Sequence, residues 1–313
     1  MDTKLFTDCK DRLISNCSKV IVGKEDVTQQ IIICLIASGH VLLEDLPGTG
    51  KTMLLRAFSK SIGGDFKRIQ FTPDLMPSDL TGINFYNQKK GEFEFRKGPL
   101  FANIVLADEI NRAVPRSQSA LLEVMEEKQL SIDGTTYRLE EPYMVMATQN
   151  PVESYGTFPL PEAQLDRFFM KLSLGYMTRD QEIGILRRKE TVKIIDELEQ
   201  VVTTDEILQM RKAYSQVNVS NEIAAYIMQI IEYTRSSSLL VNGVSTRGSL
   251  ALYKASQINA ALNGRDFVIP EDVKKEAMAV LPHRIMLSGR SHLGNMGFVR
   301  NMLEDIEVPL EQN

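Results

Sequence analysis

The chain has 313 residues, of which 43% are hydrophobic and 25% are charged, a composition typical of a soluble globular protein with about two domains. The net charge of −5 argues against extended binding to a nucleic-acid backbone, because such a surface needs an excess of lysine and arginine. Three scattered cysteines and three scattered histidines lack the spacing of a disulfide framework or a zinc site.

The N-terminal residues carry charges and no long apolar core, so they differ from a signal peptide. The most apolar stretch near this end, Ile31 to Ala37, is too short to cross a bilayer. We therefore expect a cytoplasmic protein that is not embedded in a membrane.

Apolar residues at spacings of three and four predict two helices, over residues 5–20 and from about residue 24 to Ala37. Five short apolar runs of strand length follow, and helical stretches separate several of them. Strands that are apolar on both faces indicate a parallel sheet covered by helices on both sides. The five runs are Val41–Leu43, Phe66–Phe71, Ile104–Ala107, Tyr143–Ala147 and Phe168–Leu174.

Two segments interrupt this alternation. Residues 74–98 form a long insertion, in which Phe93 and Phe95 alternate with glutamates and predict a hairpin. Residues 130–140 contain Asp133-Gly134, a strong signal for a tight turn between two strands. We expect both hairpins to project from one end of the sheet.

The strands stop after about residue 176. Residues 179–202 are charged and helical, which predicts a connector between two domains. The following residues carry helical stripes and a proline at the start of a helix, Pro270. We therefore expect residues 1–178 to form an α/β domain with N-terminal helices, and residues 203–313 to form a small all-α domain.

The stretch from Val41 to Thr52, VLLEDLPGTGKT, has the features of a phosphate-binding loop. An apolar strand leads into a turn rich in glycine, and Lys51 and Thr52 stand where a helix begins. Backbone N–H groups and the helix N-terminus attract phosphate there, while the lysine reaches the β- and γ-phosphates and the hydroxyl holds Mg²⁺. Asp45 departs from the pattern G-x-x-x-x-G-K-[ST], because it stands where the first glycine is expected, but the cradle from Pro47 onward is intact.

Polar residues follow two later strands. Asp108 and Glu109 end the apolar run IVLADE, and adjacent acids at the end of a buried strand suit a site where the first holds Mg²⁺ and the second activates water. Asn150 follows the next strand, where an amide can position water beside a γ-phosphate. An Asn-Pro pair by itself indicates only a turn.

Two arginines are further candidates. Arg167, beside Asp166, suits either a surface ion pair or an arginine finger that reaches the nucleotide of a neighbouring subunit, a contact worth about 10³–10⁵ in rate. Arg247 follows Ser245-Thr246 at the start of a helix. It suits either a phosphate contact or an exposed position at the end of a helix.

In chain order, these residues match Walker A, Walker B, sensor 1, the arginine finger and sensor 2 of AAA+ ATPases. The longer motifs resemble the MoxR family, a helix-2-insert group related to the motor subunits of magnesium chelatase. The resemblance runs from about Ile21 to Leu281. It rests on PSDLTG at 77–82, GPLFANIVLADEINRAVPRSQSALLEVMEE at 98–127, ATQNP at 147–151 and GTFPLPEAQLDRF at 156–168.

The resemblance implies an αβα core of the P-loop NTPase type, whose parallel five-stranded sheet has the order 5-1-4-3-2. It implies a helix-2-insert hairpin within residues 74–98 and a pre-sensor hairpin at residues 130–140. The helical lid is expected to be displaced from its usual AAA+ position, so that Arg247 could serve either its own site or that of a neighbour.

The resemblance also implies Mg²⁺-dependent ATP hydrolysis in a ring, expected to be a hexamer, that drives chaperone-like assembly or activation of protein complexes. The implied ligands are ATP or ADP and Mg²⁺, and the implied partner is a protein with a von Willebrand factor A domain, with no stable nucleic-acid complex. The implied nucleotide-binding residues are Ile21, Val22, Gly23, Leu46, Pro47, Gly48, Thr49, Gly50, Lys51, Thr52, Met53 and Asp108, with Thr52 and Asp108 at the metal. The implied catalytic residues are Glu109, Asn150, Arg167 and Arg247.

Two other functions stay open on the sequence. A motor subunit of a metal chelatase shares both hairpins, and an effect of a tetrapyrrole-dependent partner would favour it. A nucleic-acid motor or transcription activator is disfavoured by the acidic balance and by the lack of the GAFTGA loop of bacterial enhancer-binding activators. Stimulation of the ATPase by DNA would favour that class. A nucleotide fold without catalysis is disfavoured, because every catalytic position holds a competent residue.

Overall fold

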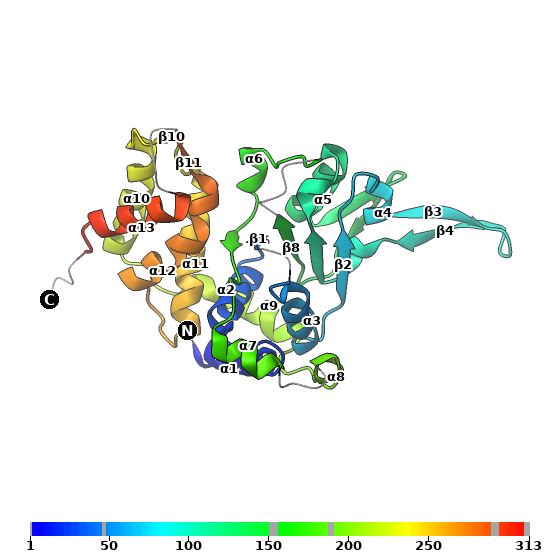
Figure 1. The fold of residues 1–313 in the computed structure, drawn as a ribbon, viewed down its shortest axis with the longest axis horizontal. Coiled ribbons are helices and arrows are strands. Elements are labelled where there is room, and N and C mark those ends of the chain that lie inside the picture. Colours follow the sequence, from blue (N-terminus) through cyan, green and yellow to red (C-terminus); the bar gives the residue numbers. More distant parts are fainter. Residues whose placement is uncertain (1, 46–47, 150–155, 187–190, 289–293, 310–313) are drawn as a thin grey trace.

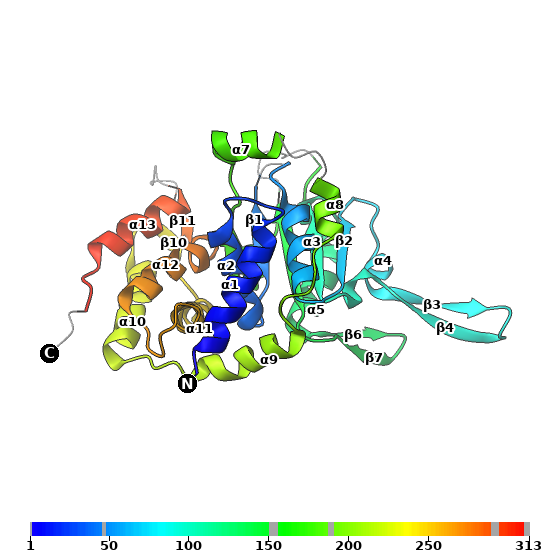
Figure 2. The same cartoon turned by 90° about the horizontal axis from the view of Figure 1, so that it is seen from below.

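The computed structural model describes residues 2–45, 48–149, 156–186, 191–288 and 294–309. A central sheet lies between two layers of helices, with a long hairpin extending from one side and a bundle of helices on the other (Figure 1). In the perpendicular view, the second hairpin lies on one side of these layers and α7 (Arg179–Leu186) on the opposite side (Figure 2).

Five parallel strands form the central sheet in the order β2-β5-β8-β1-β9, which is the predicted order 5-1-4-3-2 when these strands are numbered along the chain. Their bounds are β1 (Val41–Glu44), β2 (Phe66–Gln70), β5 (Ile104–Asp108), β8 (Met144–Gln149) and β9 (Met170–Leu172). In this register Gln70 lies opposite Asp108, and Glu44 lies opposite Gln149. The carboxyl ends of the strands therefore share one edge, where ligands bind in sheets of this kind.

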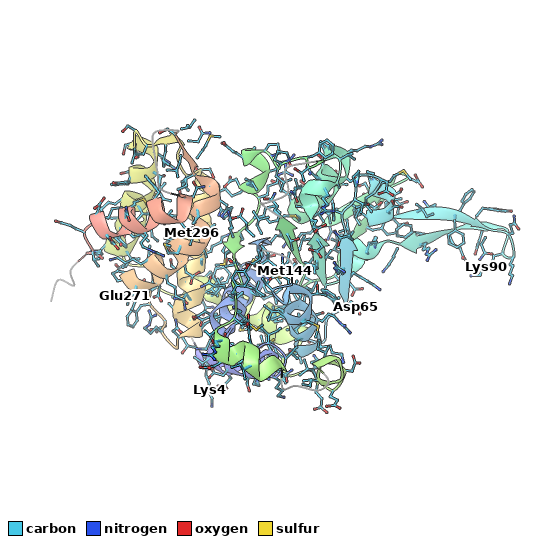
Figure 3. All side chains as sticks on the ribbon, in the orientation of Figure 1. Lys4, Asp65, Lys90, Met144, Glu271 and Met296 are labelled. Atoms are coloured by element: carbon cyan, nitrogen blue, oxygen red, sulfur yellow. The ribbon has the colours of Figure 1, made fainter. Side chains whose placement is uncertain are left out.

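Successive residues of β5 belong to two different cores, because side chains of a strand point alternately to opposite faces. Ile104 and Leu106 pack with α1 (Lys4–Ser18), α2 (Glu25–Ile36) and α3 (Lys51–Ser61). Val105 and Ala107 pack with α4 (Pro77–Thr81) and α5 (Pro115–Glu127). Burial on both faces explains why β1, β5 and β8 read as continuous apolar runs, whereas the edge strand β2 exposes Lys67, Arg68 and Gln70. Figure 3 shows the side chains filling these layers, with Met144 inside.

Both predicted hairpins are present. The first pairs β3 (Gly82–Asn87) with β4 (Glu92–Lys97) and extends far from the sheet, with Lys90 at its tip (Figure 3). The second pairs β6 (Gln129–Ile132) with β7 (Thr135–Arg138). They contact each other: Asn84 Nδ2 donates to Asp133 Oδ2 at 2.7 Å, and the rings of Phe95 and Tyr137 stack with centroids 4.5 Å apart.

The remaining elements are mostly helical. Short 3₁₀ turns occur at η1 (Pro99–Phe101), η2 (Ile110–Arg112), η3 (Tyr214–Gln216) and η4 (Pro282–Arg284). The later helices are α6 (Glu162–Leu165), α7 (Arg179–Leu186), α8 (Thr191–Asp196), α9 (Thr204–Ala213), α10 (Asn221–Ser236), α11 (Thr246–Leu262), α12 (Pro270–Val280) and α13 (Asn295–Asp305). A short antiparallel pair, β10 (Leu240–Asn242) and β11 (Met286–Leu287), adds a feature that the sequence did not predict among these helices.

Helix α9 packs on the N-terminal helices. Arg211 Nη2 donates to the Leu35 carbonyl of α2 at 2.7 Å, and Arg12 Nη2 of α1 lies 2.6 Å from Glu206 Oε1. Helices α10 to α13 form the separate bundle, which we call the lid (Figure 1). The division of the chain at residues 178 and 202 stays a prediction.

Cys9, Cys17 and Cys34 are buried free thiols. Within the described part of the chain, no helix is both long enough and apolar enough to cross a membrane.

A buried carboxyl group lies at the contact between the lid and α2. Glu276 of α12 is fully buried, and its Oε1 accepts a hydrogen bond from Gln30 Nε2 at 3.0 Å. Its Oε2 has no hydrogen-bond partner among the residues that the structure describes. Burial raises the pKa of Glu276 to about 8, because the charged form would lose its hydration. The folded protein therefore keeps this group protonated at neutral pH.

We expect the stability of the protein to depend on pH through Glu276. Between the ordinary pKa of 4.5 and about 8, the folded chain holds a proton that the unfolded chain releases, so the contribution of Glu276 to stability falls as pH rises through that window. The slope from one such group is about 1.4 kcal/mol per pH unit. Glu276→Gln should remove this slope, measured as the difference in urea-unfolding free energy between pH 6 and pH 8. The exposed substitution Glu232→Gln is the control, and a parental slope in Glu276→Gln would contradict the assignment.

Candidate active site

The glycine-rich loop joins the end of β1 to the start of α3. Gly48 and Gly50 have φ of +84° and +89°, a left-handed conformation that favours glycine. Gly50 is the residue before the first turn of α3, and a Cβ added there would lie 3.2 Å from Ile21 Cδ1. The loop therefore has the backbone of a cradle at a helix N-terminus, with Ile21 beside it.

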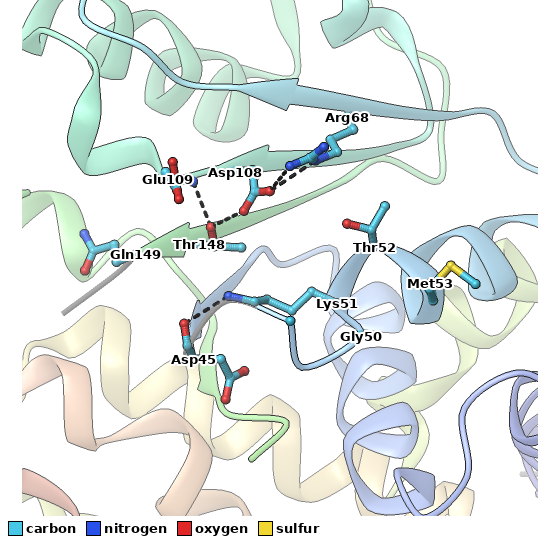
Figure 4. Close-up of a pocket in the computed structure, with 11 residues that line it drawn as sticks. Asp45, Gly50, Lys51, Thr52, Met53, Arg68, Asp108, Glu109, Thr148 and Gln149 are labelled. Atoms are coloured by element: carbon cyan, nitrogen blue, oxygen red, sulfur yellow. Dashed lines mark hydrogen bonds and ion pairs between the residues drawn. The ribbon is translucent and has the colours of Figure 1, made fainter. Parts of the chain in front are cut away.

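Lys51, Thr52 and Met53 line a cavity of about 350 Å³ at the carboxyl edge of the sheet (Figure 4). The cavity is also lined by Asp45, Gly48, Gly50, Arg68, Asp108, Glu109, Thr148 and Gln149. Lys51 Nζ donates to the Asp45 carbonyl at 3.0 Å, so the ammonium lies over the loop. The volume falls in the range of small-molecule sites.

Asp108, at the end of β5, is held from both sides. Its Oδ1 accepts a hydrogen bond from Thr148 Oγ1 at 2.6 Å, and its Oδ2 lies 2.7 Å from Arg68 Nη2. The Glu109 N–H in turn donates to Thr148 Oγ1 at 2.8 Å. Thr148, on the neighbouring strand β8, therefore fixes both acidic residues relative to each other (Figure 4).

Glu109 has an unusual backbone, with φ +57° and ψ +49°. Residues other than glycine rarely adopt this conformation, and such outliers cluster at functional sites. Its Oε2 accepts a hydrogen bond from Gln70 Nε2 at 2.7 Å and lies 3.1 Å from Arg112 Nε. The carboxylate is thus held at the rim of the cavity by two donors.

The two arginines singled out in the sequence lie together, and neither lines the cavity that contains Lys51. Arg167 Nη2 lies 3.2 Å from Glu126 Oε2, and Arg247 Nη2 lies 2.7 Å from Glu126 Oε1. Arg167 belongs to the sheet domain and Arg247 to the lid, so one carboxylate of α5 bridges the two. All three side chains are partly exposed.

Comparison with known proteins identifies both domains. Residues 40–170 match the ATPase family associated with various cellular activities (AAA), and residues 232–305 match the AAA lid domain. The chain is 39% identical over 287 residues to "Chaperone MoxR1" of Mycobacterium tuberculosis, covering 89% of this chain and 76% of that protein. It is 31% identical over 310 residues to "Protein MoxR" of Methylorubrum extorquens, covering 90% of each.

The chain belongs to the MoxR family of AAA+ ATPases. As a MoxR-family ATPase, it hydrolyses ATP. Its fold matches the crystal structure of a candidate ATPase from Cytophaga hutchinsonii, with a TM-score of 0.92 and 38% identity, over 98% of this chain and 97% of that one. An uncharacterised Bacillus subtilis protein, YeaC, is 48% identical over 305 residues, covering 96% and 95%. The family resemblance read from the sequence is confirmed.

In this MoxR-family ATPase, the structure brings most of the expected nucleotide-binding residues to one edge. Gly48, Gly50, Lys51, Thr52, Met53 and Asp108 line the cavity, Ile21 lies against the loop, and the expected catalytic residue Glu109 lines the same cavity. Leu46, Pro47 and Asn150 lie outside the described residues. Gln149, which precedes Asn150, lines the cavity.

Sequence reasoning missed Arg68, Gln70, Thr148 and Glu126. Gln70 ends β2 directly opposite Asp108, so strand pairing brings its amide to the acids. Gln70 could have been predicted in part, because polar residues at the carboxyl ends of adjacent parallel strands meet at one edge of the sheet. Glu126 lies within the stretch 98–127 that carries the family resemblance, but no local pattern marks it, because its partners lie 41 and 121 residues further along the chain.

The residues of this edge fit a magnesium nucleotide. The Thr52 hydroxyl and the Asp108 carboxylate are hard oxygen donors of the kind that Mg²⁺ prefers, and both face the cavity that Lys51 enters. The left-handed glycines Gly48 and Gly50 present bare backbone where phosphate would approach. Arg68 supplies the positive charge that Asp108 faces in this structure.

Proposed function

We propose that this ATPase is Mg²⁺-dependent, works as a ring, expected to be a hexamer, and performs chaperone-like remodelling, assembly or activation of protein complexes. One observation carries the proposal. Lys51, Thr52, Asp108 and Glu109 share a cavity, whereas Arg167 and Arg247 lie together outside it. A site divided in this way is complete only when a second subunit supplies the arginines.

The roles of the residues follow from their chemistry. N–H groups of the loop around Gly48 to Gly50 and the start of α3 bind the phosphates, and Lys51 leaves the Asp45 carbonyl to reach the γ-phosphate. Thr52 and Asp108 would hold Mg²⁺, which neutralises charge on the β- and γ-phosphates when bound. Glu109, once released by Gln70, orients and deprotonates a water molecule for in-line attack on the γ-phosphate.

The shared site requires a head-to-tail interface, which closes into a ring when the rotation between subunits permits. We propose that Arg167 acts as the finger and that Asn150 positions the attacking water. Arg247 serves the neighbouring site together with Arg167, because both contact the same carboxylate.

Exposed aromatic residues on the long hairpin β3–β4 favour a role in binding a client protein. Phe93 and Tyr86 are 74% and 53% exposed and form an edge-to-face pair near its end. Apolar side chains exposed on a projecting element suit contact with another protein. The relative from Mycobacterium tuberculosis is named a chaperone. We propose a client or partner protein, with a von Willebrand factor A domain as the expected type, a cytoplasmic location and no stable nucleic-acid complex.

A second function shares the same machinery. The motor subunit of a metal chelatase is favoured by the presence of both hairpins, β3–β4 and β6–β7. A change in ATPase rate on adding a tetrapyrrole-dependent partner would favour it over general remodelling. Stimulation by DNA would instead favour a nucleic-acid motor.

Removal of the Lys51 ammonium tests the nucleotide site. Lys51→Ala should weaken ATP binding by about 30-fold or more, equivalent to about 2 kcal/mol or more, because a charge-assisted contact to phosphate is lost. Titration calorimetry with Mg²⁺·ATP measures the change. Lys212→Ala, an exposed lysine of α9, is the control. Unchanged ATP affinity in Lys51→Ala would exclude the loop as the phosphate site.

A further inference from the structure

Asp45 stands where the general phosphate-loop pattern has its first glycine, and both oxygens of its carboxylate accept hydrogen bonds. The residue is only 6% exposed, and its carboxylate accepts three hydrogen bonds. Ser173 Oγ donates to Oδ1 at 2.7 Å, the Leu174 N–H to Oδ2 at 2.8 Å, and the Gly175 N–H to Oδ1 at 3.1 Å. These donors belong to the turn that leaves β9, about 130 residues away in sequence.

The turn is bound from its other side by a buried lysine. Lys24 Nζ donates to the carbonyls of Leu174, Gly175 and Tyr176, the last at 3.1 Å. Lys24 is 7% exposed and directly follows Ile21 to Gly23, the segment expected beside adenine. The N–H groups of the turn therefore face the Asp45 carboxylate of the phosphate loop. The carbonyls of the turn face the Lys24 ammonium, which comes from the segment where the base of the nucleotide is expected.

Helix α7 begins three residues after this turn and lies against the segment Ile21 to Gly23. A Cβ added to Gly23 would lie 1.7 Å from Gln181 Nε2 of α7. Figure 2 shows α7 outside the two helix layers, next to the connection between α1 and α2. The position of α7 is thus set by a turn that Asp45 and Lys24 hold between them.

We propose that Asp45 is a positioning residue, whose carboxylate holds the turn at 173–176 so that α7 covers the base side of the nucleotide site. The carboxylate acts on the turn and not on phosphate. Toward the loop, Asp45 offers its backbone carbonyl, which accepts from Lys51 in this structure and which a glycine at this position would also have. This inference rests on the proposed nucleotide site.

Asp45→Gly gives a sharp test, because it restores the general motif G-x-x-x-x-G-K-T. If the carboxylate were only tolerated, this variant should bind nucleotide as well as the parent. We expect it instead to bind ADP about tenfold more weakly, because all three hydrogen bonds that hold the turn are lost and α7 no longer covers the base. Inorganic triphosphate, which has no base, should bind within about twofold of the parent, since the cradle and Lys51 are unchanged.

Calorimetric titrations of ADP and of inorganic triphosphate, each with Mg²⁺, measure both affinities on the full chain. Ser173→Ala removes the one side-chain donor and should weaken ADP alone, by about threefold. Ser173→Thr keeps the hydroxyl and is the matched control. Circular dichroism checks folding, and if Asp45→Gly does not fold, Ser173→Ala decides by the same comparison.

Unchanged ADP affinity, or an equal loss for ADP and triphosphate, would overturn the proposal. Lys51→Ala, titrated in parallel, separates this failure from that of the site itself. If Lys51→Ala loses triphosphate binding while Asp45→Gly shows no selectivity for ADP, only the role of Asp45 is wrong. If Lys51→Ala keeps triphosphate binding, the loop is not the phosphate site.

Discussion

Replacing Arg167 with alanine should leave ATP binding intact and slow hydrolysis by about 10³–10⁵-fold, or about 4–7 kcal/mol of barrier. Arg167 lies outside the cavity of its own chain, so in the proposed ring we expect its guanidinium to stabilise the transition state in the neighbouring site. Steady-state hydrolysis and equilibrium ATP binding measure the two effects separately. Arg300→Ala, an exposed arginine of α13, is the control.

Mixing variants tests whether the site is shared. A Lys51→Ala subunit has a defective nucleotide site but an intact Arg167, and an Arg167→Ala subunit has the reverse. In rings formed from equal amounts, about one quarter of the junctions join an intact site to an intact arginine, given one head-to-tail contact per site. The mixture should therefore recover about a quarter of the parental activity, although each variant alone is inactive. No recovery at any ratio would rule out a finger supplied by the neighbour.

Glu109→Gln should bind ATP normally and hydrolyse it about 10²–10⁴-fold more slowly, because an amide cannot accept the proton of the attacking water. Glutamine keeps an oxygen that can accept the hydrogen bond from Gln70 or Arg112, so the local structure should persist. Single-turnover hydrolysis with pre-bound ATP isolates the chemical step.

Glu304→Gln, at an exposed position of α13, controls for the loss of one negative charge. Near-normal turnover in Glu109→Gln would show that Glu109 is not the base. A variant that behaves as expected also retains ATP, so affinity capture with it should recover client proteins and identify the pathway.

The sequence predicted the sheet well because its information is local. Apolar runs, glycine turns and acids at strand ends each occupy a few consecutive residues, and the family motifs fixed the strand order. The pair β10–β11 escaped prediction because strands of three and two residues carry no periodicity.

Contacts between distant residues were harder to predict. Gln70 contacts Glu109 through the register of two strands, and Glu126 joins arginines from two domains. Asp45 could be noted as a departure from a motif, but its partners at 173–175 are visible only once β1 and β9 are paired. Side chains whose roles depend on the register of distant elements give no local pattern.

If the protein forms the proposed ring, the carboxylate that Arg167 and Arg247 share links hydrolysis in one subunit to the lid of its neighbour. Arg167 belongs to the sheet domain and Arg247 to the lid, and both contact Glu126. Asp166, next to Arg167, is in turn bound by Ser245 and Arg284 of the lid, at 2.9 Å each. If these arginines complete the adjacent site, a lid rotation in one protomer withdraws charge from the nucleotide of the next. Turnover would then pass from protomer to protomer in sequence instead of occurring independently in each.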